Sequence, residues 1–114
     1  MDYRQVTDDF AVSPQIAPED MEAIKAAGYR SIICNRPDGE QPGQPTAAEI
    51  AVAAEAAELV FRHIPFTSGQ MTEEDVAKMV EALDEIPGPV FAYCRSGARS
   101  TNIFLAAQQA KKGG

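Results

Sequence analysis

Short apolar runs and longer stretches with helical spacing alternate along this chain. Residues 31–35, 59–66 and 90–93 are short runs rich in β-branched and aromatic side chains, a pattern that predicts strands. Residues 3–13 contain two more short runs on either side of the polar segment 7–9, which predicts a hairpin at the edge of a sheet. Strand positions are therefore expected at the start, in the middle and near the end of the chain.

Four segments between and after these runs carry helix signals. Pro18, with acidic residues directly after it, and Gly28 beyond the end predict the first helix. Thr46 and Thr72 each stand three positions before an acidic residue, the capping-box pattern that predicts a helix start. The expected helices cover residues 18–27, 46–57, 72–86 and 100–110, followed by a frayed tail over 110–114.

This order of elements predicts an α/β fold in a single domain covering residues 1–114. We expect a central, mostly parallel sheet flanked by helices, because strands that alternate with helices usually pair in parallel. Ligands of such sheets bind at the carboxyl ends of the strands, where loops meet helix N-termini. Two loops occupy such positions: the segment 36–45, rich in glycine and proline, and the segment 94–100 after the last strand.

Composition and charge narrow the classes of function. The formal net charge is −7 and the sequence pI is about 4.6, so no nucleic-acid partner is expected, because the protein's field would repel a polyphosphate. The chain has neither an apolar stretch of membrane-span length nor a secretory signal, and two cysteines are typical of a reducing compartment. These features predict a cytoplasmic protein without a membrane partner. Because nucleotide fingerprints and zinc-type ligand spacings are missing, we also expect no cofactor and no metal site.

Residues 94–100, Cys-Arg-Ser-Gly-Ala-Arg-Ser, combine a thiol, a permissive backbone position and a guanidinium. A helix that begins just after Cys94 directs unpaired amides and its positive dipole end at the loop, which favours the nucleophilic thiolate. Gly97 lets successive amides converge on an anion, and Arg99 can add a bidentate fork. We therefore predict that Cys94 and Arg99 are catalytic. The other members of the predicted anion-binding loop are Arg95, Ser96, Gly97, Ala98 and Ser100. A buried structural cysteine with solvated arginines is the simpler alternative.

Four stretches of the chain, in order, are "RPDGEQPGQPT", "FRHIPFTSG", "MTEEDV" and "CRSGARS". Together they resemble the phosphatase-like domain of beta-lactamase-hydrolase-like proteins, over about residues 3 to 110. The resemblance implies a fold similar to dual-specificity and tyrosine phosphatases. Relatives in that family are fused to metallo-beta-lactamase-like persulfide dioxygenases, which implies sulfur chemistry and a persulfide dioxygenase fused or encoded alongside as a partner. The loop "YCRSGARS" also resembles the active-site loop of rhodanese sulfurtransferases.

The chain departs from the cysteine-phosphatase pattern at three positions. Four residues separate Cys94 from Arg99, where phosphatases have five, and the tighter loop suits a terminal sulfur better than a phosphoryl group. Tyr93 replaces the usual histidine before the nucleophile. Ser68 lies near the position where dual-specificity phosphatases place a general-acid aspartate. Without an acid, cleavage of a phosphomonoester would lose a factor of roughly 10² to 10⁴.

These departures favour a sulfurtransferase on a phosphatase-like scaffold. In this hypothesis Cys94 takes sulfane sulfur from a small anionic donor, such as thiosulfate or a low-molecular-weight persulfide, and passes it to a thiol acceptor. The alternative is a phosphatase that forms a phosphocysteine at Cys94 and uses Asp38 as general acid. A third reading is an anion-binding or regulatory module without turnover.

Three further residues are candidates that also have simpler structural explanations. Asp38 precedes a glycine and is well explained as a turn residue, although its loop could overhang the site as acid or pocket rim. Arg36 can form a surface ion pair with Glu40 or shape the pocket mouth. Cys34, in the predicted strand 31–35, is a candidate second thiol, but a small buried hydrophobe is the commoner role.

Overall fold

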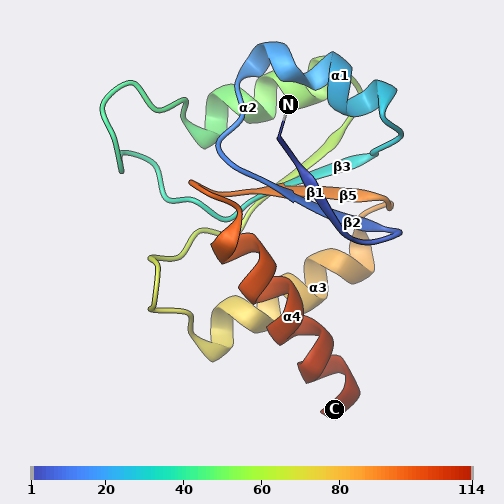
Figure 1. The fold of residues 1–114 in the computed structure, drawn as a ribbon, viewed down its shortest axis with the longest axis vertical. Helices are drawn as coiled ribbons and strands as arrows, with labels where there is room; N and C mark the ends of the chain where they lie inside the picture. Colours follow the sequence, from blue (N-terminus) through green and yellow to red (C-terminus); the bar gives the residue numbers. More distant parts are fainter. Residues whose placement is uncertain (1, 114) are drawn as a thin grey trace.

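A five-stranded sheet lies at the centre of the computed structural model, which describes residues 2–113 (Figure 1). Its order is β1-β2-β5-β3-β4; β1 is antiparallel to β2, and the other pairs are parallel. The predicted edge hairpin and mostly parallel sheet are thus confirmed. The strands are β1 Arg4–Thr7, β2 Phe10–Ser13, β3 Ser31–Cys34, β4 Val60–His63 and β5 Val90–Tyr93.

Helices cover both faces of the sheet (Figure 1). One face carries α1 and α2, and the other carries α3 and α4, which pack against each other. Thr46 and Thr72 cap their helices with the predicted capping boxes. The helices are α1 Met21–Ala26, with the short 3-10 turn η1 Pro18–Asp20 before it, α2 Ala47–Ala56, α3 Glu73–Glu85 and α4 Ala98–Gly113.

Two apolar cores lie on the two faces, because successive side chains of a strand point in opposite directions. Ile32 on β3 belongs to the cluster under α1 and α2, together with Ile50 and Phe91. Its neighbour Ile33 belongs to the cluster under α3 and α4, together with Met79. Each fully buried side chain of this size contributes about 1.5–3 kcal/mol relative to exposure, so burial on both faces fixes the register of the central strands.

The last helix differs from the prediction at both ends. It begins at Ala98, two residues before the expected Ser100, because the left-handed Gly97 (φ 97°) ends the loop and lets the helix start at once. It continues to Gly113, beyond the expected end at residue 110, while residue 114 lies outside the described residues. The expected fraying of this tail stays a prediction. Lys111 near this end pairs with Asp84 of α3 at 2.9 Å, and lysines suit the negative end of a helix dipole.

Two other elements are shorter than predicted. The run 59–66 forms a strand only over Val60–His63, and its last residues enter the loop toward α3. The first helix splits into η1 and α1. In the described part of the chain, no helix combines the length and the apolar character that crossing a membrane requires.

Candidate functional site

Three loops meet at the carboxyl edge of the sheet, on the left in Figure 1. They follow β3, β4 and β5, which run parallel and therefore end on the same side. The loop after β3 carries Arg36 to Glu40, the loop after β4 carries Thr67 and Ser68, and the loop after β5 carries the cysteine. The topology thus brings segments far apart in the sequence to one place.

The loop after β5 curls around the sulfur of Cys94. The residue is fully buried, and its Sγ accepts a hydrogen bond from the backbone N–H of Gly97 at 3.1 Å. Gly97 has a φ of 97°, a left-handed conformation that suits glycine, whereas a Cβ would meet only ordinary contacts with Ser13 at 3.6 Å. Glycine is therefore required here by backbone conformation and not by lack of space.

The first turn of α4 supplies the other features of an anion site. Because α4 begins at Ala98, its first amides have no carbonyl partner within the helix, and its positive end faces the loop. The N–H of Ala98 donates to Ser96 Oγ at 3.3 Å. Arg99 lies in this same first turn. An anion at this edge can meet backbone donors and a guanidinium together.

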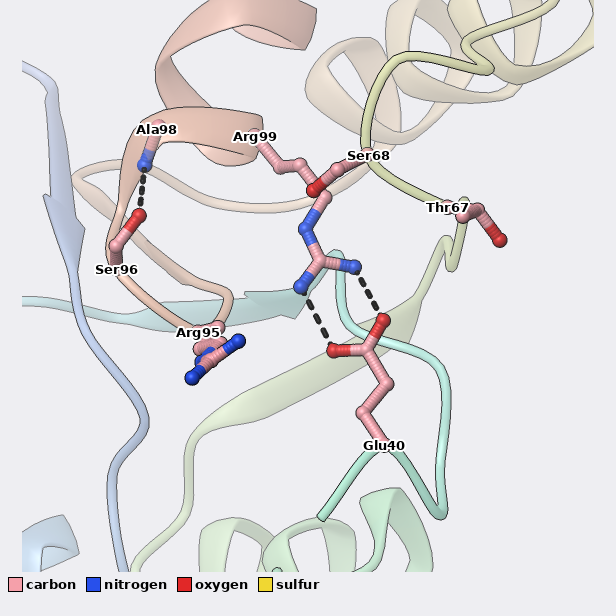
Figure 2. Close-up of a pocket in the computed structure, with 7 residues that line it drawn as sticks. All are labelled: Glu40, Thr67, Ser68, Arg95, Ser96, Ala98 and Arg99. Atoms are coloured by element: carbon pink, nitrogen blue, oxygen red, sulfur yellow. Dashed lines mark hydrogen bonds and ion pairs between the residues drawn. The ribbon is translucent and has the colours of Figure 1, made fainter.

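Arg99 is buried and already has partners. Its Nη1 and Nη2 donate to Glu40 Oε2 and Oε1 at 2.8 and 2.7 Å, a bidentate pair that Figure 2 shows as two dashed lines. Nη1 also donates to the backbone carbonyl of Phe66 at 3.0 Å. The hydrogen bonds that Arg99 donates to Glu40 raise the pKa of Arg99. The guanidinium that could bind an anion therefore holds a carboxylate of the protein itself.

Glu40 connects two buried arginines. Its Oε1 also accepts from Nε of Arg36 at 2.8 Å, and the Arg36 side chain is only 1% exposed. The remaining Arg36 donors reach Gln15 Oε1 at 2.9 Å and Gln41 Oε1 at 3.0 Å. Hydrogen bonds from Arg99, and then those from Arg36, lower the pKa of Glu40 to about 2 despite some desolvation. Glu40 is consequently an anion at any physiological pH.

A cavity of about 550 Å³ opens at this edge (Figure 2). Both arginines of the loop, Arg95 and Arg99, line it, and hydroxyl groups line much of the remainder. The side chain of Cys94 is not among the lining groups, because the thiol is fully buried in this conformation. The lining residues are Glu40, Thr67, Ser68, Arg95, Ser96, Ala98 and Arg99.

Ser100 makes a structural contact. It is fully buried, and its Oγ donates to Asn35 Oδ1 at 2.8 Å. Asn35 Nδ2 in turn donates to the carbonyl of Ile64 at 3.0 Å. This chain of bonds ties α4 to the ends of β3 and β4, so the side chain of Ser100 supports the loop, while its place in the anion-binding loop stays a prediction.

Asp38 does not line the cavity. Its Oδ1 accepts from the backbone N–H of Ala47 at 2.8 Å, and so it caps the start of α2. In this structure Asp38 is engaged at the start of α2, and its role as acid or pocket rim stays a prediction. An unpaired amide in the first turn of a helix is a strong competitor for a nearby carboxylate. The carboxylate at the cavity is instead Glu40, which contacts Arg99 although the two residues stand 59 positions apart in the sequence.

Cys34 faces the core under α1 and α2. It is buried, its Sγ donates to the carbonyl of Arg36 at 3.4 Å, and burial raises the pKa of its thiol. Both cysteines are free thiols. These contacts match a small buried hydrophobe, while a role as second thiol stays a prediction. Within residues 2–113 no group of three metal-ligating side chains comes together.

Solved structures similar to this chain include phosphatases and candidate phosphatases. A candidate phosphatase from Neisseria meningitidis is 35% identical, with a TM-score of 0.81 over 88% of this chain and 71% of that one. The catalytic core of a PP-IP phosphatase from S. cerevisiae is 15% identical, with a TM-score of 0.63 over 83% of this chain and 56% of that one. The predicted tyrosine and dual-specificity phosphatase-like fold is thus confirmed.

Relatives of known family show where the chain belongs. A beta-lactamase hydrolase-like protein from Agrobacterium fabrum is 39% identical over 83% of this chain, which spans only 22% of that protein's length. Residues 2–111 match the family described as beta-lactamase hydrolase-like protein, phosphatase-like domain. The resemblance drawn from the sequence motifs is confirmed, whereas its rhodanese-like element has no support from these relatives. The chain belongs to the family of phosphatase-like domains of beta-lactamase hydrolase-like proteins.

Proposed function

We propose that this domain is a cysteine-dependent phosphatase that uses Cys94 as nucleophile. The observation that carries the proposal is the loop between β5 and α4, which holds the sulfur against an amide and places Arg99 in the first turn of the helix. The phosphatase fold and family support this reaction better than the sulfur transfer that the sequence favoured.

In the first step, the Cys94 thiolate attacks phosphorus, an S–P bond forms, and the P–O bond to the leaving group breaks with its electron pair on oxygen. Water then attacks the phosphocysteine, releasing phosphate and the thiolate. Arg99 and the first amides of α4 stabilise the charge on the phosphoryl oxygens. For Arg99 to do so, its contact with Glu40 must open or widen.

The choice of leaving group follows from the acids at the cavity. Asp38 is engaged at α2, and Glu40, with a pKa of about 2, carries no proton to give. The hydroxyls of Thr67 and Ser68 are far weaker acids than a carboxylic acid. Esters of acidic alcohols need little protonation as they leave. We therefore propose aryl phosphates or phosphoanhydrides as the substrate class, in preference to alkyl phosphates.

The test is phosphate release from an aryl phosphate and from an alkyl phosphate by the wild-type domain and Cys94→Ser. We expect turnover of the aryl ester that is lost in the variant, and an alkyl ester slower by roughly 10² or more, the size of a missing general acid. Equal rates for both esters would contradict the leaving-group argument. Aryl turnover that persists in Cys94→Ser would overturn the proposal.

Sulfur transfer remains a second candidate because of one feature of the loop. Only four residues separate Cys94 from Arg99, and the sulfite that leaves thiosulfate needs no acid. In that reaction Cys94 attacks the outer sulfur, the S–S bond of thiosulfate breaks, and an acceptor thiol later removes the sulfur. A one-sulfur mass adduct on Cys94 without aryl phosphate turnover would favour this candidate. Its partners would be the sulfur donor, the acceptor thiol and a persulfide dioxygenase.

A further inference from the structure

Neither of the two groups on which the proposed chemistry depends is free in this conformation, although Arg99 lines the cavity. Cys94 is fully buried, and both terminal nitrogens of Arg99 are bonded to Glu40. The structure therefore describes a closed state of the site.

Glu40 is held firmly in that state. One of its oxygens bridges two guanidiniums, those of Arg36 and Arg99. The Arg36 side chain is buried and further fixed by Gln15 and Gln41, so the carboxylate has an anchored partner on one side. With a pKa of about 2, Glu40 does not leave by protonation at neutral pH. Only another anion can take its place on Arg99.

We propose that Glu40 is an internal ligand of the anion site, which a substrate anion must displace from Arg99 before the loop opens around Cys94. The proposal rests on the proposed function only in that the anion binds at Arg99. Arg36 retains Glu40 after displacement, because its Nε bond to Oε1 does not involve Arg99. The carboxylate can thus swing away without losing both of its partners.

This arrangement also selects among anions. Because Glu40 is tethered beside Arg99, it competes for the guanidinium at an effective concentration that the tether sets. A free carboxylate must exceed that concentration to bind Arg99 in its place. A phosphoryl or thiosulfate dianion offers more charge and additional oxygens for the first amides of α4. Dianions therefore displace Glu40 more readily than carboxylates do. Glu40 is a specificity residue in this view, not a catalytic acid.

The experiment compares Glu40→Gln with wild type by titrating inorganic phosphate and acetate in calorimetry. We expect phosphate to bind the variant about tenfold more tightly, the effect of removing one competing charge-assisted contact. The affinity for acetate should rise by at least the same factor, so the preference of the site for phosphate over acetate becomes smaller. Glu58→Gln is the matched control: it removes one negative charge from an exposed pair with Lys25 outside the cavity and should change neither affinity.

A second readout follows the thiol directly. Iodoacetamide should alkylate Cys94 several-fold faster in Glu40→Gln, as mapped by peptide mass, while Cys34 stays unlabelled in both proteins. If Glu40 instead only orients Arg99, phosphate binding will weaken and alkylation will not accelerate, and this outcome overturns the proposal. Both assays measure binding and access, so they give an answer even where aryl phosphate turnover fails.

Loss of Glu40 leaves two buried guanidiniums without a carboxylate, and the variant could fold poorly. Glu40→Asp keeps the charge but shortens the side chain, so it tests the bidentate contact in a folded background. Phosphate should raise the unfolding temperature of either variant more than that of wild type, because it replaces the missing ligand. An equal or smaller rise in both variants would contradict displacement.

Discussion

The ends of β3 and β5 form a natural comparison. Both strands are buried; Cys34 is the last residue of β3, Cys94 directly follows β5, and Tyr93 of β5 pairs with Cys34 in the register. At Cys34 the chain folds back so that a carbonyl, that of Arg36, faces the sulfur. At Cys94 it folds back so that an amide, that of Gly97, faces the sulfur. The two thiol side chains thus have opposite hydrogen-bond partners, an acceptor at Cys34 and a donor at Cys94.

The difference shows that the turn after a strand decides what a cysteine can do. At Cys34 the sulfur donates to a carbonyl, and burial raises the pKa of this thiol. An amide donates and stabilises negative charge on sulfur. Burial alone would predict the same inert behaviour for both residues, since both are buried.

The largest expected effect on turnover comes from replacing the sulfur of Cys94 with oxygen, and the same change at Cys34 serves as the comparison. Cys94→Ser should lower aryl phosphate turnover by more than about 10³-fold, because a nucleophile is lost. Cys34→Ser retains a donor for the carbonyl of Arg36 and should keep turnover within about threefold. Initial rates of phosphate release measure both. A comparable loss in both variants would remove the functional distinction between the two cysteines.

A glycine exchange tests the amide that faces Cys94. Gly97→Ala forces an L side chain into a left-handed conformation, at a cost of about 1–2 kcal/mol, and relaxation of that strain moves the N–H away from sulfur. We expect turnover to fall by about tenfold or more. Gly28→Ala, also at positive φ but at the end of α1 and outside the cavity, should lose similar stability with unchanged turnover. Urea unfolding and rates together separate the two effects.

The site could be predicted from sequence where its parts are local. Cys94, Gly97 and Arg99 lie within six positions, and their spacing after an apolar run indicates a loop and helix start. The strands and the helix starts at both threonine capping boxes could equally be predicted from the sequence, because each depends on neighbouring residues. The start of α4 was missed by two residues, since a left-handed glycine can end a loop as well as continue one.

The part that could not be predicted depends on distant contacts. Asp38 and Glu40 stand two positions apart in one loop, and sequence favoured Asp38 as the acid of the phosphatase alternative. The fold gives Asp38 the free amide of Ala47 and gives Glu40 two buried arginines. Which carboxylate meets Arg99 depends on how a Gly/Pro-rich loop folds across the sheet edge. No periodicity or capping rule describes such a loop.

Acid unfolding tests the ion network that joins the two strand ends. The pKa of Glu40 is lowered to about 2 from an ordinary 4.5, so its contribution to stability is fully present above pH 4.5 and is lost as pH falls toward 2. Stability of wild type should therefore drop more steeply than that of Glu40→Gln between these values. Urea unfolding at several pH values measures the slopes. Glu58→Gln should keep the wild-type slope, and equal slopes in all three proteins would contradict the network.

The smallest effect is expected from Cys34→Ala, which also tests Cys34 as a second thiol. The change removes one buried sulfur and its bond to the carbonyl of Arg36, and should cost about 1 kcal/mol of unfolding free energy. Turnover should stay within about twofold. Because the Cys34 sulfur packs into the cluster under α1 and α2, mild oxidation of wild type should leave no disulfide to Cys94 in non-reducing peptide mapping. Formation of that disulfide, and its absence in Cys34→Ala, would instead make Cys34 a resolving thiol and place both strand ends in one redox reaction.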